Sequence, residues 1–419
     1  MKTGKLRSLL YERRYALCIF GFLLVYSFFV PGEMKPWRSG AVVYTFHAVD
    51  YSMGFCSRFL PGAIYGALVG KYTEAAMTAY ELVLLVLFFL LVALMLDSVL
   101  KRVKEKDRPY IAILMFFLLT GPYALPLFTR RPGMLDFYWV LFSVPVVFCL
   151  SNRKLYFFAV PFFALLILTH YAAILNYVPL LLLMMLYKLS CAADKKEKAI
   201  LSAVFALSLA VSVGLTLYFV LHERENLVYP MNDFVQILLS RGVEPNGNIY
   251  YDYVLYRDLY DQSLKEYFIS RYSVDVFGPT DESTLGVILK QVLSSFGRIS
   301  FSDKVMSLAF SAPVAALLFS AVFSQVKRQD DKFKKLILIC GPLLFVVAFA
   351  GGCCFSTDAN RWATHAFIGA FAFILFVIYT ENGDPASYFR EVLSRVPKRL
   401  LILYMIVYCM KIVEPYESS

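Results

Sequence analysis

The sequence predicts an all-α membrane protein, a polytopic bundle of about 10–11 transmembrane helices with interfacial amphipathic helices on its outer face. Of the 419 residues, 59% are hydrophobic and only 17% are charged, too few polar groups to cover a water-soluble globule. The apolar residues form long runs, and lysines and arginines cluster between these runs. We therefore expect a single polytopic membrane domain over residues 1–419, with outer loops 31–76 and 222–304 inserted in it.

Eleven apolar runs have the composition of a membrane-spanning helix. A hydrocarbon core about 30 Å thick needs about 20 residues per helix, and shorter runs serve where the bilayer thins. The predicted spans are Tyr15–Val30, Met77–Leu96, Tyr110–Phe128, Phe137–Leu150, Leu155–Thr169, Ile174–Tyr187, Ala199–Leu221, Val305–Phe323, Leu336–Ala350, Thr364–Tyr379 and Leu400–Met410. The last run is short, so a bundle of ten spans stays open.

The basic clusters predict the orientation, because cytoplasmic loops carry an excess of Lys and Arg. Clusters lie before the first span and after every second span, at residues 2–14, 101–108, 153–154, 188–198, 327–335 and 390–399. We therefore expect a multi-pass protein of a bacterial plasma membrane with a cytoplasmic N-terminus. The net charge of +10 follows from this topology, so no nucleic-acid partner is expected. The eight cysteines include no CxxC pair, which argues against a zinc site or a disulfide scaffold.

Asp50 and Arg58 follow the first span in a predicted outer segment. A carboxylate at this place could accept a proton from an acceptor hydroxyl or hold a divalent cation. The apolar stretch from Arg58 to Val69 is expected to lie flat or to dip into the membrane. The structural alternative is an Asp50–Arg58 ion pair that orients the loop.

A predicted outer tip contains Arg130, Arg131 and Asp136. Arginines are unexpected there, because the excess of Lys and Arg belongs in the cytoplasmic loops. Guanidinium groups bind phosphate oxygens in pairs, so a lipid phosphate or diphosphate is the expected ligand. Contact with headgroups of membrane lipid is the alternative.

His170 lies between two short apolar runs, so we expect it in a polar pocket below the outer surface. A hydrogen-bonded core histidine is the structural alternative.

Asp358, Arg361 and Trp362 form a further outer segment before a predicted span. Asp358 and Arg361 would be one helical turn apart, so an ion pair that anchors the helix end is the alternative to a functional role. Trp362 suits the membrane interface. Four outer segments thus bring Asp, Arg or His, while most inner loops bring little beyond Lys and Arg.

The long outer loop contains tyrosines at helical spacing, Tyr253, Tyr256, Tyr260 and Tyr267. They indicate an interfacial helix whose rings form either an aromatic belt or a platform for sugar rings.

One span followed by an outer loop with an acid at Asp50, then many spans and a long outer loop, resembles the GT-C superfamily of polyprenyl-phosphate-dependent glycosyltransferases. The arginines and the histidine on outer loops are also similar to those of bacterial polysaccharide polymerases and O-antigen ligases. GT-C enzymes often have paired acids in the first loop, and here Asp50 has no acidic neighbour.

We therefore expect an outer-face glycosyltransferase or glycan polymerase that uses a lipid-linked saccharide. Asp50, Asp358 and His170 are the candidate catalytic residues, and Arg58, Arg130, Arg131, Asp136, Arg361 and Trp362 are the candidate substrate-binding residues. A lipid-glycan flippase or another secondary transporter is the alternative from a different class. Interrupted helices in two matching halves of the sequence, with charged residues at mid-membrane, would indicate it. A non-catalytic membrane subunit is the third.

Overall fold

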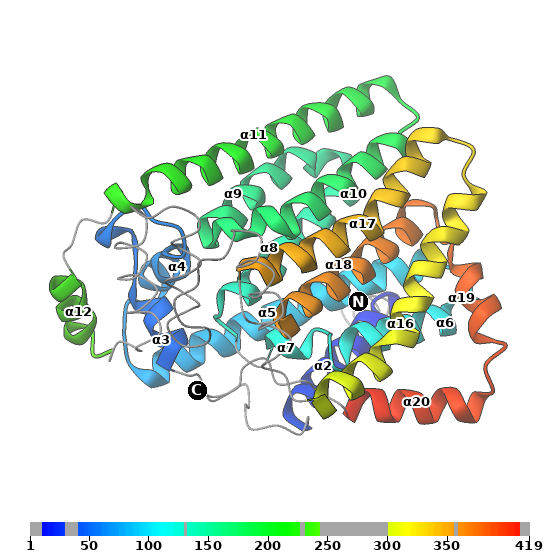
Figure 1. Ribbon diagram of the computed structural model, residues 1–419, viewed down its shortest axis with the longest axis horizontal. Coiled ribbons are helices and arrows are strands. Elements are labelled where there is room, and N and C mark those ends of the chain that lie inside the picture. Colours follow the sequence, from blue (N-terminus) through cyan, green and yellow to red (C-terminus); the bar gives the residue numbers. More distant parts are fainter. Residues whose placement is uncertain are drawn as a thin grey trace, which may run out of the picture.

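The computed structural model describes residues 11–29, 41–129, 132–226, 231–243, 301–355 and 359–410, and within these ranges it contains helices and no strand. Figure 1 shows the long helices packed side by side. The predicted all-α bundle is confirmed. The α-helices of these ranges are α2 (Arg14–Phe29), α3 (Ala41–Ala48), α4 (Leu60–Leu68), α5 (Glu74–Arg102), α6 (Arg108–Leu119), α7 (Pro126–Thr129), α8 (Leu135–Ser151), α9 (Ala159–Thr169), α10 (Tyr177–Cys191), α11 (Lys195–Asn226), α12 (Met231–Ser240), α16 (Phe301–Arg328), α17 (Lys332–Phe355), α18 (Ala359–Thr380), α19 (Ala386–Leu393) and α20 (Lys398–Met410).

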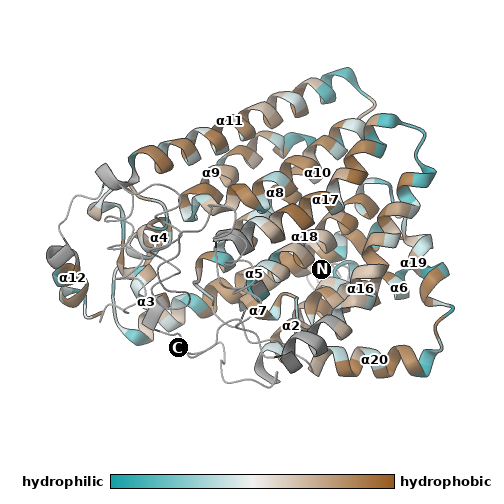
Figure 2. Cartoon of the chain, viewed as in Figure 1, coloured by the Kyte–Doolittle hydropathy of each residue, from teal (hydrophilic) through white to brown (hydrophobic). Residues whose placement is uncertain are grey.

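Five helices are long and apolar enough to cross a membrane: Glu74–Arg102, Lys195–His222, Ala309–Arg328, Lys332–Gly351 and Asn360–Thr380. Four further apolar helices are shorter, at Arg14–Ser27, Arg108–Leu119, Leu135–Ser151 and Tyr177–Cys191. Large hydrophobic side chains such as Val83, Leu217 and Val347 are more than half exposed, as expected for surfaces that contact lipid. Figure 2 shows hydrophobic residues along the helices and hydrophilic residues gathered at many of their ends.

Every one of the eleven predicted runs overlaps a helix, but the run Tyr110–Phe128 is broken. Helix α6 ends at Leu119 and α7 begins only at Pro126. Gly121 between them has a φ of 92°, a conformation that favours glycine. A Cβ at Gly121 would lie 2.0 Å from Cε1 of Tyr408 in α20, so the break lets α20 approach.

Helix α20 packs along α6 and ends beside α2. The rings of Tyr408 and Phe117 lie 5.1 Å apart, and the Tyr26 hydroxyl donates to the carbonyl of Cys409 over 2.9 Å. The short last run is therefore an integral helix of the bundle.

The basic clusters meet at one end of the bundle, which we call the basic end (residues 101–108, 153–154, 188–198, 327–335 and 381–399). Contrary to the sequence expectation for inner loops, this end also contains structural acids. Buried Asp97 binds Lys101 and Arg13 over 2.8 and 3.1 Å, and buried Asp107 binds Arg390 over 3.1 Å. These pairs join helices at the basic end, because a buried carboxylate needs a cationic partner.

Helices α3 and α4 cover the opposite end of the bundle, with α12 nearby (Figure 1). The segment expected to lie flat is a helix, α4, whose residues Leu60, Pro61, Gly62 and Tyr65 are buried. Gly62 allows α4 to touch α3, because a Cβ there would lie 1.7 Å from the Val49 carbonyl oxygen. Helix α8, with most of its side chains buried, reaches this end with its first turn.

Candidate functional site

Asp136 lies in the first turn of α8 and is the centre of a buried polar cluster (Asp136, Arg361, His365 and Tyr177). Arg361 of α18 contacts both carboxylate oxygens, with Nε 2.5 Å from Oδ2 and Nη2 2.8 Å from Oδ1. His365, one turn further along α18, places Nε2 3.1 Å from Asp136 Oδ1. The hydroxyl of Tyr177, from α10, lies 2.8 Å from His365 Nδ1.

The hydrogen-bond partners assign the tautomer of His365. An ionised carboxylate only accepts, so His365 Nε2 carries the proton that it donates to Asp136. His365 Nδ1 is then the acceptor, and the Tyr177 hydroxyl donates to it. These contacts run from Tyr177 through His365 and Asp136 to Arg361, and they join α10, α18 and α8. The Tyr177 hydroxyl donates its proton to His365, so its oxygen can still accept a hydrogen bond from another group.

A second buried pair lies beside this cluster. His47 of α3 has Nδ1 3.5 Å from Glu81 Oε1 of α5, and both side chains are fully buried. Tyr138 of α8 has its hydroxyl 3.4 Å from His47 Nε2 and 3.2 Å from the Tyr80 hydroxyl. Burying a carboxylate in a membrane helix costs free energy. Glu81 beside His47 is therefore a candidate functional group.

Successive residues of α8 connect the two buried groups. Tyr138 contacts His47, while the Trp139 ring lies 5.5 Å from the His365 ring and 5.7 Å from the His170 ring. Three of the four histidines of the chain therefore surround the first two turns of α8. These three histidines, His47, His170 and His365, lie toward the end of the bundle opposite the basic end.

Asp50 follows α3 at the same end and is held in place by Ser52 and Arg241. The Ser52 amide donates to Oδ1 over 2.8 Å, and Arg241 Nη1, just after α12, lies 2.8 Å from Oδ2. Partial burial acts to raise the pKa of Asp50, but the Ser52 hydrogen bonds and the Arg241 charge outweigh it and lower that pKa below its ordinary value. Asp50 is therefore ionised at neutral pH.

Arg58 and His170 are brought together, with Nη2 of Arg58 3.0 Å from Nε2 of His170. Arg58 has a φ of 75°, which is unusual for a residue with a side chain, and its amide donates to the Leu168 carbonyl over 3.1 Å. The backbone of the first outer segment is thereby joined to the end of α9.

The structure changes the surroundings expected for several candidates. Asp50 pairs with Arg241, so the Asp50–Arg58 ion pair expected as the structural alternative is wrong. Asp136 does not lie on an exposed tip, since it is only 3% exposed in α8. Trp362 is buried against the His365 ring, and its placement at the membrane interface stays a prediction. Arg130, Arg131, Asp358 and the tyrosines at 253–267 lie outside the described residues.

Several residues of this site were not singled out by the sequence analysis. Glu81 had a readable signal, because it is an acid inside the predicted span Met77–Leu96. His365 also had a signal, because it lies just inside the predicted span Thr364–Tyr379, next to the segment of Asp358, Arg361 and Trp362. Tyr177 and Arg241 carried no such signal, since a lone Tyr or Arg near a helix end has many structural roles.

Among the described residues around Asp50, none completes a set of ligands for a divalent cation, so a cation at Asp50 stays a prediction. Within the described ranges, no group of three His, Cys, Asp or Glu residues could hold a metal ion. The Arg241 guanidinium already supplies the positive charge beside the carboxylate. We therefore derive no step through a metal.

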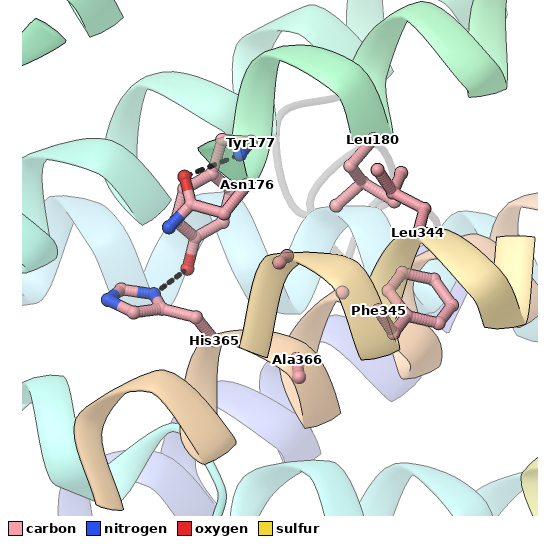
Figure 3. Close-up of a pocket in the computed structure, with 9 residues that line it drawn as sticks. Asn176, Tyr177, Leu180, Leu344, Phe345, His365 and Ala366 are labelled. Carbon is pink, nitrogen blue, oxygen red and sulfur yellow. Dashed lines mark hydrogen bonds between the residues drawn. The ribbon is translucent and has the colours of Figure 1, made fainter. Parts of the chain in front are cut away.

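A small cavity opens between α10, α17 and α18 beside the buried cluster (Figure 3). Its polar corner is made by Asn176, Tyr177 and His365. The remaining lining is apolar and consists of Leu180, Leu344, Phe345, Ala348, Ala366 and Gly369.

No protein-family model matches the sequence, and no curated protein matches it. Among solved structures, the chain is similar to a crystal structure of the Archaeoglobus fulgidus oligosaccharyltransferase in complex with zinc and sulfate, with a TM-score of 0.40 and 15% sequence identity. The match covers 96% of this chain and 53% of that chain, so this chain spans about half the length of that enzyme. A likeness of this degree carries no argument about chemistry, and the site is interpreted from its own geometry.

Proposed function

We propose that this chain is a membrane glycosyltransferase or glycan polymerase that uses a lipid-linked sugar donor at the membrane face opposite the basic end. One observation carries the proposal. Asp136, Glu81, His47 and His365 are buried around the first turns of α8, with partly buried His170 beside them, and ionised Asp50 lies at the same end of the bundle. A membrane protein retains such costly groups at one end when a polar substrate reacts there.

The reaction would be a displacement at the anomeric carbon of the donor sugar. An acceptor hydroxyl oxygen forms the new bond to that carbon, and the bond from the carbon to the phosphate oxygen breaks. The lipid phosphate leaves with the electron pair, and Asp50 takes the acceptor proton. Because Arg241 and Ser52 keep Asp50 ionised, the carboxylate is available at neutral pH, and Arg241 must turn partly aside to admit the acceptor.

Arg58 is the described arginine best placed to bind the leaving phosphate, since it sits beside His170 and half-exposed at the same end. Arg361 has a different task in this scheme. Its Nη2 donates to Asp136 and its Nε contacts the same carboxylate as an ion pair, so Arg361 holds the buried cluster together. The roles expected for Arg130, Arg131 and Asp358 remain part of the proposal.

Asp50→Asn tests the proposal, because it preserves size and removes the proton acceptor. Purified protein in vesicles is given polyprenyl-phosphate sugars with a radiolabelled hexose, and transfer to an added glycan acceptor is measured. We expect transfer by the wild type and at least a hundredfold loss in Asp50→Asn, because general base catalysis contributes about 10²–10⁴-fold.

Asp194→Asn is a matched control at the basic end. Asp194 also accepts from the amide two residues on, over 3.0 Å, and pairs with an arginine, Arg153, over 2.8 Å. Asp194→Asn should keep full transfer. If the wild type moves the lipid-linked saccharide across the bilayer with its sugar–phosphate bond intact, the protein is a transporter and the proposal fails.

A further inference from the structure

The polar corner of the cavity between α10, α17 and α18 contains a hydrogen-bond donor with nothing to donate to. Asn176 Oδ1 accepts the Tyr177 amide over 2.6 Å at the start of α10, which assigns Nδ2 as the other end of the carboxamide (Figure 3). Asn176 is only 7% exposed, and Nδ2 finds no acceptor in the structure as far as it is described. An unpaired buried donor costs about 1–3 kcal/mol, which an acceptor on a ligand would recover.

Two indole N–H groups beside the same histidine share this property. The rings of Trp139 and Trp362 each lie 5.5 Å from the His365 ring, and both residues are buried. Neither Nε1 atom has an acceptor among the described side chains and backbone. The two indoles do not line the cavity, so among these described donors it is Asn176 Nδ2 that is left for an acceptor in the cavity.

The charge of the corner favours an uncharged ligand over a phosphate. Arg361 balances Asp136, and the described residues that line the cavity include no Lys or Arg. The Tyr177 oxygen keeps acceptor capacity because its proton goes to His365, so the corner offers a donor and an acceptor side by side. Hydroxyl and amide groups need that combination, whereas a phosphate needs donors and positive charge.

We infer that Asn176 is a specificity-determining residue, which donates from Nδ2 to one uncharged oxygen of the saccharide, a ring hydroxyl or an acetamido carbonyl. The inference rests on the proposed function. The cavity volume of about 10 Å³ admits one group of the size of a water molecule, so a single substituent of the sugar enters it. Leu344, Phe345 and Ala348 close its apolar side.

Binding to purified protein in nanodiscs tests the inference without requiring transfer. Trp139 and Trp362 are two of the three tryptophans of the chain, so intrinsic fluorescence reports on this corner. The probes are methyl glycosides of common hexoses, their 2-acetamido counterparts, and inorganic pyrophosphate. We expect a saturable change with a glycoside that added pyrophosphate does not compete away, and the glycoside set that binds more tightly identifies the oxygen.

Two variants locate the binding. Asn176→Asp keeps the oxygen that accepts the Tyr177 amide and replaces the donor, and Ala348→Val fills the cavity without changing a hydrogen bond. Each should weaken glycoside binding at least tenfold. Asn152→Asp, at a site where Asn152 accepts the Lys154 amide over 3.1 Å at the basic end, should leave binding unchanged.

Thermal stability of each variant separates lost binding from lost folding. If neither glycoside set gives a saturable signal, if folded Asn176→Asp and Ala348→Val bind like the wild type, or if pyrophosphate competes for the corner, the inference is wrong. Glycoside binding that depends on Asn176, in a protein that transfers no sugar, would support the subsite while refuting the proposed function.

Discussion

Two aspartates with arginine partners have different surroundings, and these decide what each carboxylate can do. Asp136 is buried, receives two guanidinium contacts and a histidine N–H, and holds α8 to α18. The Asp50 side chain is 17% exposed and its arginine partner comes from α12 at the surface. A partly exposed pair can open for a substrate, whereas a buried pair is more costly to break.

Arg361→Lys should lower stability, because lysine keeps the charge and loses the two-point contact with Asp136. The expected cost is about 1.5–3 kcal/mol, the value of a hydrogen bond to a charged group. The thermal midpoint in detergent measures it. Arg153→Lys is the control, since its pair with Asp194 is exposed and worth about 0–1 kcal/mol. Equal thermal midpoints for the two variants would show that the two-point contact of Arg361 with Asp136 does not stabilise the fold.

The attachment of α12 to Asp50 should depend on pH in a defined direction. The folded pKa of Asp50 lies below its ordinary value, so the stabilisation is complete above the unfolded pKa of about 3.9 and is lost as the pH falls through the lower, folded value. A spin label on Ser240→Cys should stay immobile from pH 7 to pH 5 and become mobile only below about pH 4. With Asp50→Asn added, it should be mobile throughout. If the label becomes mobile between pH 7 and pH 6 instead, a group other than Asp50 controls the attachment of α12.

At the scale of elements, the end of the bundle opposite the basic end depends on close contact between short helices. Helices α3 and α4 are only eight and nine residues long, so they are stable through packing rather than through helix propensity. The His47 and Tyr65 rings stack at 5.2 Å, and the Gly62 contact brings the two backbones together. This contact sets where His47 and Asp50 lie.

Gly62→Ala should separate α3 from α4, because the added Cβ would lie within 3 Å of the carbonyl oxygens of Val49 and Phe46. Overpacking of this kind costs about 1–3 kcal/mol or more. Gly66→Ala in the same helix is the matched control, since its Cβ would meet the Tyr72 hydroxyl at 3.4 Å and Asp50 Oδ2 at 4.0 Å, both ordinary contact distances. Thermal midpoints and sugar transfer are measured for both, and we expect a loss only in Gly62→Ala. A Gly62→Ala protein as stable as the wild type would show that α3 and α4 are not in close contact.

At the scale of the molecule, the two ends of the bundle use polar residues differently. The basic end pairs its acids with lysines and arginines, as at Asp97, Asp107 and Glu381. The opposite end buries histidines and carboxylates in contact with one another. This asymmetry agrees with the proposed reaction at one face of the membrane.

The orientation predicted from the basic clusters can be tested at described positions. In a variant without the native cysteines, a membrane-impermeant maleimide should label exposed Ser240→Cys in intact cells. It should label exposed Ser394→Cys at the basic end only after permeabilisation. The reverse pattern would place the site on the cytoplasmic side and remove the basis for an outer-face reaction.

The sequence by itself determined the helices and the end of the bundle at which the polar groups collect. Apolar length and basic clusters are local properties, so each of the eleven predicted runs could be read without knowledge of its neighbours. The break at Gly121 was missed, because it depends on the approach of Tyr408 from α20.

Only the tertiary structure decided which polar groups meet. Asp136 and Arg361 are 225 residues apart and Asp50 and Arg241 are 191 apart, yet both pairs are in contact. Whether an acid finds its partner on the next loop or on a distant helix depends on the rotation and packing of whole helices, which hydropathy does not encode. For that reason Asp50 and Asp136 could be recognised as candidates from the sequence, while Arg241 and Tyr177 emerged only from the fold.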